Sequence, residues 1–236
     1  MAKKIGNIIL DMDEVIVNIS PIVYRMLRDP YREFFKDVFE DKGDLTDEEI
    51  LQRPSLFLEN WLIKEDLKED FVPGNPFFDF VISMIIELIY KKDFYDLLKP
   101  TQFANEILNN PLIMNSGDIK KVYIVTKVFK DAPEMIDYKI KFLNKHFPQF
   151  INKIELIGLT ENEKKSEIII NKNLDFELIV DDSLENIIDY ITNPNLNIDN
   201  KEILMPALGY NQEIPPEIVA LAIKRNISFS SYNNIL

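Results

Sequence analysis

The 236-residue chain has no cysteine, one histidine and one tryptophan, and its 40 acidic residues outnumber its 27 basic ones. Without cysteine, neither a disulfide framework nor a thiolate metal site can form. His146 is the single histidine, which excludes most zinc sites and histidine-based catalytic triads. The formal charge of −13 works against holding a long polyanion by phosphate contacts, so we expect no polymeric nucleic acid as a partner.

Long hydrophobic runs are also missing. The longest apolar segment, residues 77–90, contains two acidic residues and falls short of the roughly 20 apolar residues of a membrane-spanning helix. The start MAKKIGNIIL turns acidic too soon for a secretory signal peptide. These features predict a cytoplasmic protein with no membrane partner. The hydrophobic share of 46% is enough to bury one large domain, or a core with an insertion.

Two carboxylates stand at the end of the first apolar run, where residues 8–10 lead into Asp11 and Asp13. If residues 4–10 form a buried strand, the alternation of side chains places both acids on the same side of the backbone. Two carboxylates at such a short distance repel each other, so they need a divalent cation, a shared proton or a nearby lysine. Magnesium is the simplest answer, although an Asp-x-Asp pair is common by chance in so acidic a chain.

From residue 101 on, short helices alternate with apolar runs. We expect strands at 122–125, 154–159 and 177–180, and helices at 101–110, 132–145, from 165, after 182 and at 216–225. Continuous apolar strands that alternate with helices predict an α/β fold with a doubly wound parallel sheet. Ligands bind at the carboxyl ends of the strands of such sheets. The polar residues expected at those ends are Asp11, Asp13, Thr126, Asp181 and Asp182.

Residues 18–97 show helix signals and no strand pattern. Ser20, followed by proline, is typical of a helix N-cap, and residues 46–49 form a capping-box pattern. The predicted domains are therefore a helical cap inserted after the first strand and an α/β core made of residues 1–17 and 98–236.

The residue types at the strand ends suit phosphoryl transfer, in which catalysis is mainly positioning and electrostatic stabilisation. Asp11 would be the nucleophile and form an aspartyl-phosphate. Asp13 would protonate the leaving alkoxide and later deprotonate the attacking water. Mg²⁺ would take oxygen ligands from Asp11, the backbone carbonyl of Asp13, and Asp181 or Asp182.

Two further residue types would hold the phosphate group. Thr126 offers a hydroxyl and a backbone donor. Lys165 lies at the start of a predicted helix, whose N-terminus also favours anions, and its positive charge would neutralise the phosphate. Lys164 is an adjacent competitor for this role.

The ordered segments DMDEV, IVTK, EKKSE and IVDDS resemble the four motifs of the haloacid dehalogenase superfamily of phosphohydrolases. Within it, the chain is most similar to the 5′(3′)-deoxyribonucleotidases, through DMDEVIVN, DFYDLLKPTQFANEIL, FKDAPEMIDYKIKFLNKHF and LTENEKK. The resemblance implies a magnesium-dependent phosphatase whose partner is a small phosphorylated substrate, most of all a nucleoside monophosphate, and leaves a homodimer open. The site residues that it implies are Asp11 and Asp13 for catalysis, Thr126, Lys127 and Lys165 for phosphate binding, and Asp11, Asp13, Asp181 and above all Asp182 for the metal.

The chain departs from this family at two positions. Glu14 stands where the family usually has glycine, and Lys127 stands where it often has serine or another small residue. Other substrates stay open, namely a sugar phosphate, another small metabolite or a nucleic acid 3′ end, the last of which the acidic charge disfavours. An alternative of another class is a regulatory protein that binds a metal or a nucleotide without turnover, with Glu14 as the sign of lost catalysis.

Overall fold

The computed structural model contains one sheet of six strands, each parallel to its neighbours, in the order β3-β2-β1-β4-β5-β6. The structure describes residues 6–28, 45–51, 74–76, 79–80, 83–84, 87, 89, 92–110, 113, 119–128, 133–160, 163–208 and 214–232. The strands are β1 (Asn7–Leu10), β2 (Lys121–Lys127), β3 (Ile154–Leu159), β4 (Leu178–Val180), β5 (Glu202–Pro206) and β6 (Ser228–Tyr232). This sheet confirms the predicted α/β fold.

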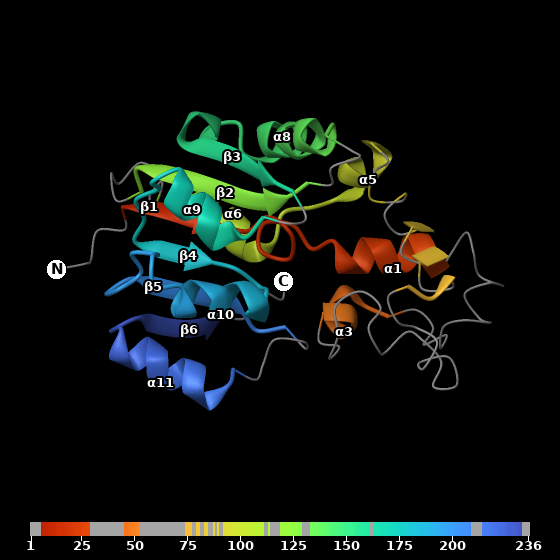
Figure 1. Ribbon diagram of the computed structural model, residues 1–236. Coiled ribbons are helices and arrows are strands. Elements are labelled where there is room, and N and C mark those ends of the chain that lie inside the picture. The colour runs from red at the N-terminus through yellow and green to blue at the C-terminus, as the bar shows by residue number, and fades with distance from the viewer. Residues whose placement is uncertain are drawn as a thin grey trace.

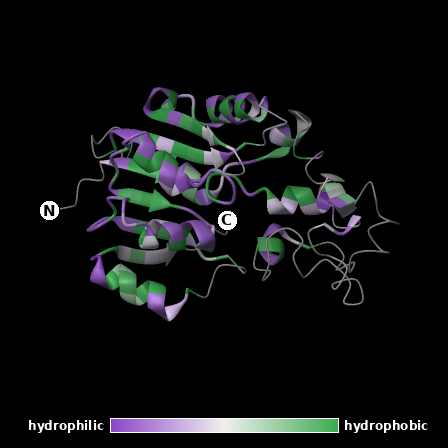
Figure 2. Ribbon diagram, viewed as in Figure 1, coloured by the Kyte–Doolittle hydropathy of each residue, from purple (hydrophilic) through white to green (hydrophobic). Residues whose placement is uncertain are grey.

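Helices cover both faces of the sheet, so the fold is doubly wound (Figure 1). Ile8 and Leu10 of β1 pack in one core cluster with α6 (Gln102–Leu108) and α8 (Met135–His146). Ile9 faces the opposite way, because successive side chains of a strand alternate. It packs with α9 (Lys165–Asn171), α10 (Leu184–Thr192) and α11 (Pro216–Lys224). Figure 2 shows β4 as hydrophobic throughout, as expected for a strand covered on both faces.

The described part of the predicted cap contains α1 (Ser20–Arg28), α3 (Asp47–Leu51) and α5 (Lys92–Leu97). Figure 1 places α1 and α3 beyond the carboxyl ends of the strands. The predicted capping box at α3 is confirmed. Glu49 N–H donates to Thr46 Oγ1 at 3.2 Å, and Thr46 N–H donates to Glu49 Oε2 at 2.8 Å. Much of residues 18–97 lies outside the described residues, and a separate cap domain stays a prediction.

Several element boundaries differ from the sequence expectations. The helix expected at 132–145 begins at Met135, and residues 131–132 lie outside the described ones. Ser20 was predicted as an N-cap, but α1 begins at Ser20 itself and its hydroxyl donates to Glu14. β3 has the predicted bounds, whereas β5 and β6 were not predicted. None of the described helices has the length and hydropathy to cross a membrane.

Candidate active site

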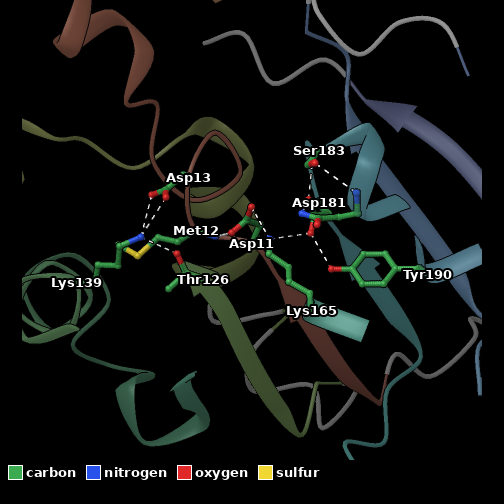
Figure 3. A network of polar contacts seen from close by, with 10 residues as sticks. Asp11, Met12, Asp13, Thr126, Lys139, Lys165, Asp181, Ser183 and Tyr190 are labelled. Carbon is green, nitrogen blue, oxygen red and sulfur yellow. Dashed lines mark hydrogen bonds and ion pairs between the residues drawn. The ribbon is translucent and has the colours of Figure 1, made fainter. Parts of the chain in front are cut away.

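Asp11, Asp13, Thr126 and Asp181 lie at the carboxyl ends of β1, β2 and β4, and Lys165, the first residue of α9, reaches the same place (Figure 3). Asp11 follows β1 directly, and its N–H continues the ladder by donating to the carbonyl of Val180 at 2.8 Å. This bond places Asp11 beside the carboxylates that follow β4. Thr126, near the end of β2, is fully buried, whereas its neighbour Lys127 is exposed.

Lys165 binds two buried carboxylates at once. Its Nζ lies 2.6 Å from Asp11 Oδ2 and 2.9 Å from Asp181 Oδ2, and only 3% of its side chain is exposed. Burial lowers the pKa of Lys165, but the charges of Asp11 and Asp181 outweigh this effect and raise it, so the ammonium stays charged. Burial raises the pKa of Asp11 to about 6; Lys165 opposes this rise, while Asp181 and Asp13 add to it. Lys165 thus holds Asp11 in place and offsets part of the negative charge.

Asp181 accepts four hydrogen bonds. Its Oδ1 accepts from Ser183 N–H at 3.0 Å and from Asn186 Nδ2 at 3.1 Å. Its Oδ2 accepts from Lys165 Nζ and, at 2.8 Å, from the Tyr190 hydroxyl. A carboxylate has about four lone-pair sites, so the contacts of Asp181 are already used to orient Lys165 and the start of α10.

Three buried carboxylates lie close enough together that they could hold a cation. Asp11, Asp181 and Asp182 each offer an oxygen atom, and these atoms lie within 4.8 Å of one another. Carboxylate oxygens are ligands that Mg²⁺ prefers, so the group fits magnesium. All three are candidate ligands: Asp181 already accepts four hydrogen bonds, and Asp11 accepts from Lys165 and from Met12 N–H. The carboxylate of Asp13 lies outside this group, and the metal contact expected from its backbone carbonyl stays a prediction.

Lys139 of α8 is a residue of the network that the sequence reasoning missed. Its Nζ donates to Thr126 Oγ1 at 2.6 Å and lies 3.1 and 3.2 Å from the two carboxylate oxygens of Asp13. The residue is fully buried, whereas the Asp13 side chain is 35% exposed. A signal was present, because helical spacing puts position 139 on the face of α8 that buries Met135 and Phe142. A lysine on such a face needs a buried partner.

The loop after β1 is held by short-range hydrogen bonds. Glu14 N–H donates to Val17 O at 2.7 Å, and Val17 N–H donates to Met12 O at 3.0 Å. Thr101 joins the loop to the start of α6, since its hydroxyl donates to Val15 O at 2.6 Å. Burial raises the pKa of Glu14 to about 7, with hydrogen bonds from Ser20 opposing the rise and the charge of Asp13 adding to it. Asp13 therefore lies on a turn that several hydrogen bonds hold.

No model of a known protein family matches the chain, and no curated protein matches it. Among solved structures, it is similar to a haloacid dehalogenase-like family hydrolase from Xanthomonas campestris. The similarity covers 95% of this chain and 99% of that one, at 16% sequence identity and a TM-score of 0.41.

Proposed function

We propose that the chain is a magnesium-dependent phosphomonoester hydrolase of the haloacid dehalogenase type, which works through an aspartyl-phosphate on Asp11. The observation that carries the proposal is the meeting of all four motif segments at one edge of the sheet. Asp11 lies 2.6 Å from Lys165, and Asp13 and Thr126 share the ammonium of Lys139. Phosphoryl transfer needs a nucleophile, an acid/base, donors to the phosphate and carboxylates that can bind a metal, all close together.

Each residue has a defined step in this mechanism. A carboxylate oxygen of Asp11 attacks phosphorus, the bond to the alkoxide breaks, and Asp13 protonates the leaving oxygen. Water then attacks the aspartyl-phosphate, Asp13 takes its proton, and phosphate leaves with Asp11 restored. Thr126 and Lys165 donate to phosphate oxygens throughout. Asp11 and Asp182 would hold magnesium, which when bound would supply positive charge to offset that of the phosphoryl group.

Lys139 suits the acid/base role of Asp13. The carboxylate keeps contact with solvent, so it can exchange protons, while the buried ammonium fixes its position. Lys127 is exposed at the end of β2, and its contact with the phosphate stays a prediction. The substrate class that we favour is a nucleoside or deoxynucleoside monophosphate, on the strength of the segments that resemble 5′(3′)-deoxyribonucleotidases.

The first test is phosphate release from a panel of nucleoside and deoxynucleoside 5′- and 3′-monophosphates, sugar phosphates and a 3′-phosphorylated oligonucleotide. We expect release from the nucleoside monophosphates in magnesium, loss of release in excess EDTA, and recovery when magnesium is added back. Release from other phosphoesters alone would keep the mechanism and reject the nucleotide substrate. A folded protein that binds magnesium or a nucleotide but releases no phosphate from any compound would reject the hydrolase in favour of the regulatory alternative.

A second prediction separates the two neighbouring aspartates after β4. Asp182→Asn should weaken magnesium binding by about 10-fold or more, because it removes a charged ligand and leaves the hydrogen bonds of Asp181 in place. Asp181→Asn should mainly lower the free energy of unfolding, by about 2–4 kcal/mol, because Lys165 and Tyr190 lose a charged acceptor. Magnesium titration calorimetry and urea denaturation in EDTA measure the two effects. The reverse pattern would make Asp181 the principal ligand.

A further inference from the structure

Glu14 has a backbone conformation and a burial that are both unfavourable for a glutamate. Its φ of 57° lies in the left-handed region, which costs an L-residue with a Cβ about 1–2 kcal/mol. The side chain is also buried, with 1% of the residue exposed. Burying a carboxylate is costly unless hydrogen bonds replace its water. Glycine, which is usual at this position in the family that the sequence resembles, would avoid both costs.

The contacts of Glu14 with Ser20 offset part of the cost of burial. Glu14 Oε1 accepts from Ser20 N–H at 2.7 Å and from the Ser20 hydroxyl at 2.5 Å. Ser20 is the first residue of α1, and the first N–H groups of a helix have no partner within it. The first turn of α1 contains no acidic residue. Glu14 therefore supplies, from six residues upstream, the carboxylate that a helix N-terminus favours.

The backbone of the same residue holds the turn that presents Asp13. Glu14 N–H donates to Val17 O at 2.7 Å, and Asp13 pairs with Val17 as an isolated β-bridge. Val17 also bridges to Pro100, and Thr101 N–H donates to Ile16 O at 2.8 Å. These bonds fix the turn to the start of α6. The hydrogen bonds between Glu14 and Ser20 connect the same turn to the start of α1.

We infer that Glu14 is a positioning residue. Its hydrogen bonds to Ser20, which we call the clasp, fix the turn that contains Asp13 against the start of α1. This helix is the first one in the stretch between β1 and α6. The inference rests on the proposed function, because it assigns Asp13 the acid/base role. It also gives Glu14 a purpose that is compatible with turnover. The carboxylate that departs from the family pattern is directed to the helix, where it does not compete with Asp11 for a cation or a phosphate.

Glu14→Ala and Glu14→Gln test the clasp as a matched pair. Both variants keep a Cβ at the left-handed position, but only glutamine keeps an oxygen that accepts from Ser20. We expect Glu14→Ala to lower kcat about 10-fold with less than a twofold change in KM. A misplaced acid/base stabilises the transition state less, while substrate binding is unchanged. Glu14→Gln should stay within about twofold of the wild type in both constants.

Hydrogen exchange of the Ser20 and Val17 amides provides a readout without turnover. In Glu14→Ala the Ser20 amide should exchange about 10-fold faster than in the wild type, and in Glu14→Gln it should not. Ser20→Ala, which removes only the hydroxyl, should show a smaller change of the same sign and serves if Glu14→Ala does not fold. Unchanged exchange would overturn the clasp. Faster exchange with unchanged kcat would overturn the positioning role. If no variant or wild type releases phosphate, the proposed function fails, while the exchange experiment still decides the clasp.

Discussion

Replacing Asp11 with asparagine should abolish phosphate release and leave the fold intact. Loss of the nucleophile should lower kcat on the order of 10⁴-fold or more, because the remaining groups have no covalent intermediate to act on. The free energy of unfolding should not fall. Burial and the neighbouring carboxylates raise the pKa of Asp11 to about 6, although Lys165 opposes them.

The sign of the stability effect follows from that pKa. The folded state binds the proton of Asp11 more tightly than the unfolded state, so charged Asp11 costs stability as the pH rises from 3.8 through about 6. At pH 8 an asparagine removes this cost, and we expect a free energy of unfolding equal to or above that of the wild type. Urea denaturation and phosphate release, measured on the same preparations, check both expectations. A stable variant that retains activity would reject Asp11 as the nucleophile.

The matched control is Asp13→Asn. In that variant the nucleophile remains, so with an aryl phosphate, whose leaving group needs no proton from Asp13, a phosphoryl group should accumulate on the peptide that contains Asp11 when the reaction is quenched in acid and analysed by mass spectrometry. Hydrolysis of the intermediate should slow by about 10²–10⁴-fold, the usual range for a lost general base. Asp11→Asn should show no modified peptide. A phosphoryl group on any other residue would overturn the assignment.

Four of the six strands could be predicted because they are mainly apolar runs bounded by polar or turn residues. β3 has the bounds expected from the sequence, and β1, β2 and β4 lie within one to three residues of theirs. β6 was missed because its sequence, SFSSY, is mostly polar, which an edge strand tolerates since only part of it is covered. β5 was missed because Pro206 indicated a break, whereas the structure places it as the last residue of the strand.

The site was predictable to the extent that it lies at strand ends. Asp11, Asp181 and Asp182 follow β1 and β4, and parallel pairing of those strands brings them together. Lys139 could not be placed in the same way, because it lies on a helix and meets Asp13 across 126 positions of sequence. Its partner depends on how α8 packs on the sheet, which no local pattern encodes. The direction of the Glu14 side chain likewise depends on where α1 begins.

The two buried lysines should differ sharply when each is replaced by methionine. Lys165→Met leaves Asp11 and Asp181 buried side by side without a cation, and breaking a buried pair in this way costs about 3–5 kcal/mol. Lys139→Met leaves Asp13 without its ammonium, but the Asp13 side chain is 35% exposed and can be hydrated. We therefore expect the free energy of unfolding to fall by only about 1–2 kcal/mol. Methionine replaces the alkyl part of lysine without its ammonium, which keeps the change in packing small. Urea denaturation in EDTA at pH 8 measures the difference.

Magnesium should separate the two variants further. A cation bound by Asp11 and Asp182 replaces part of the charge that Lys165 supplied, so added magnesium should recover more stability in Lys165→Met than in Lys139→Met. Activity should follow another order: Lys139→Met should keep its fold and lose about 10²-fold in kcat, because Asp13 loses the ammonium that positions it. Equal losses of stability in the two variants, with equal responses to magnesium, would show that Lys165 does not hold the carboxylates together in solution.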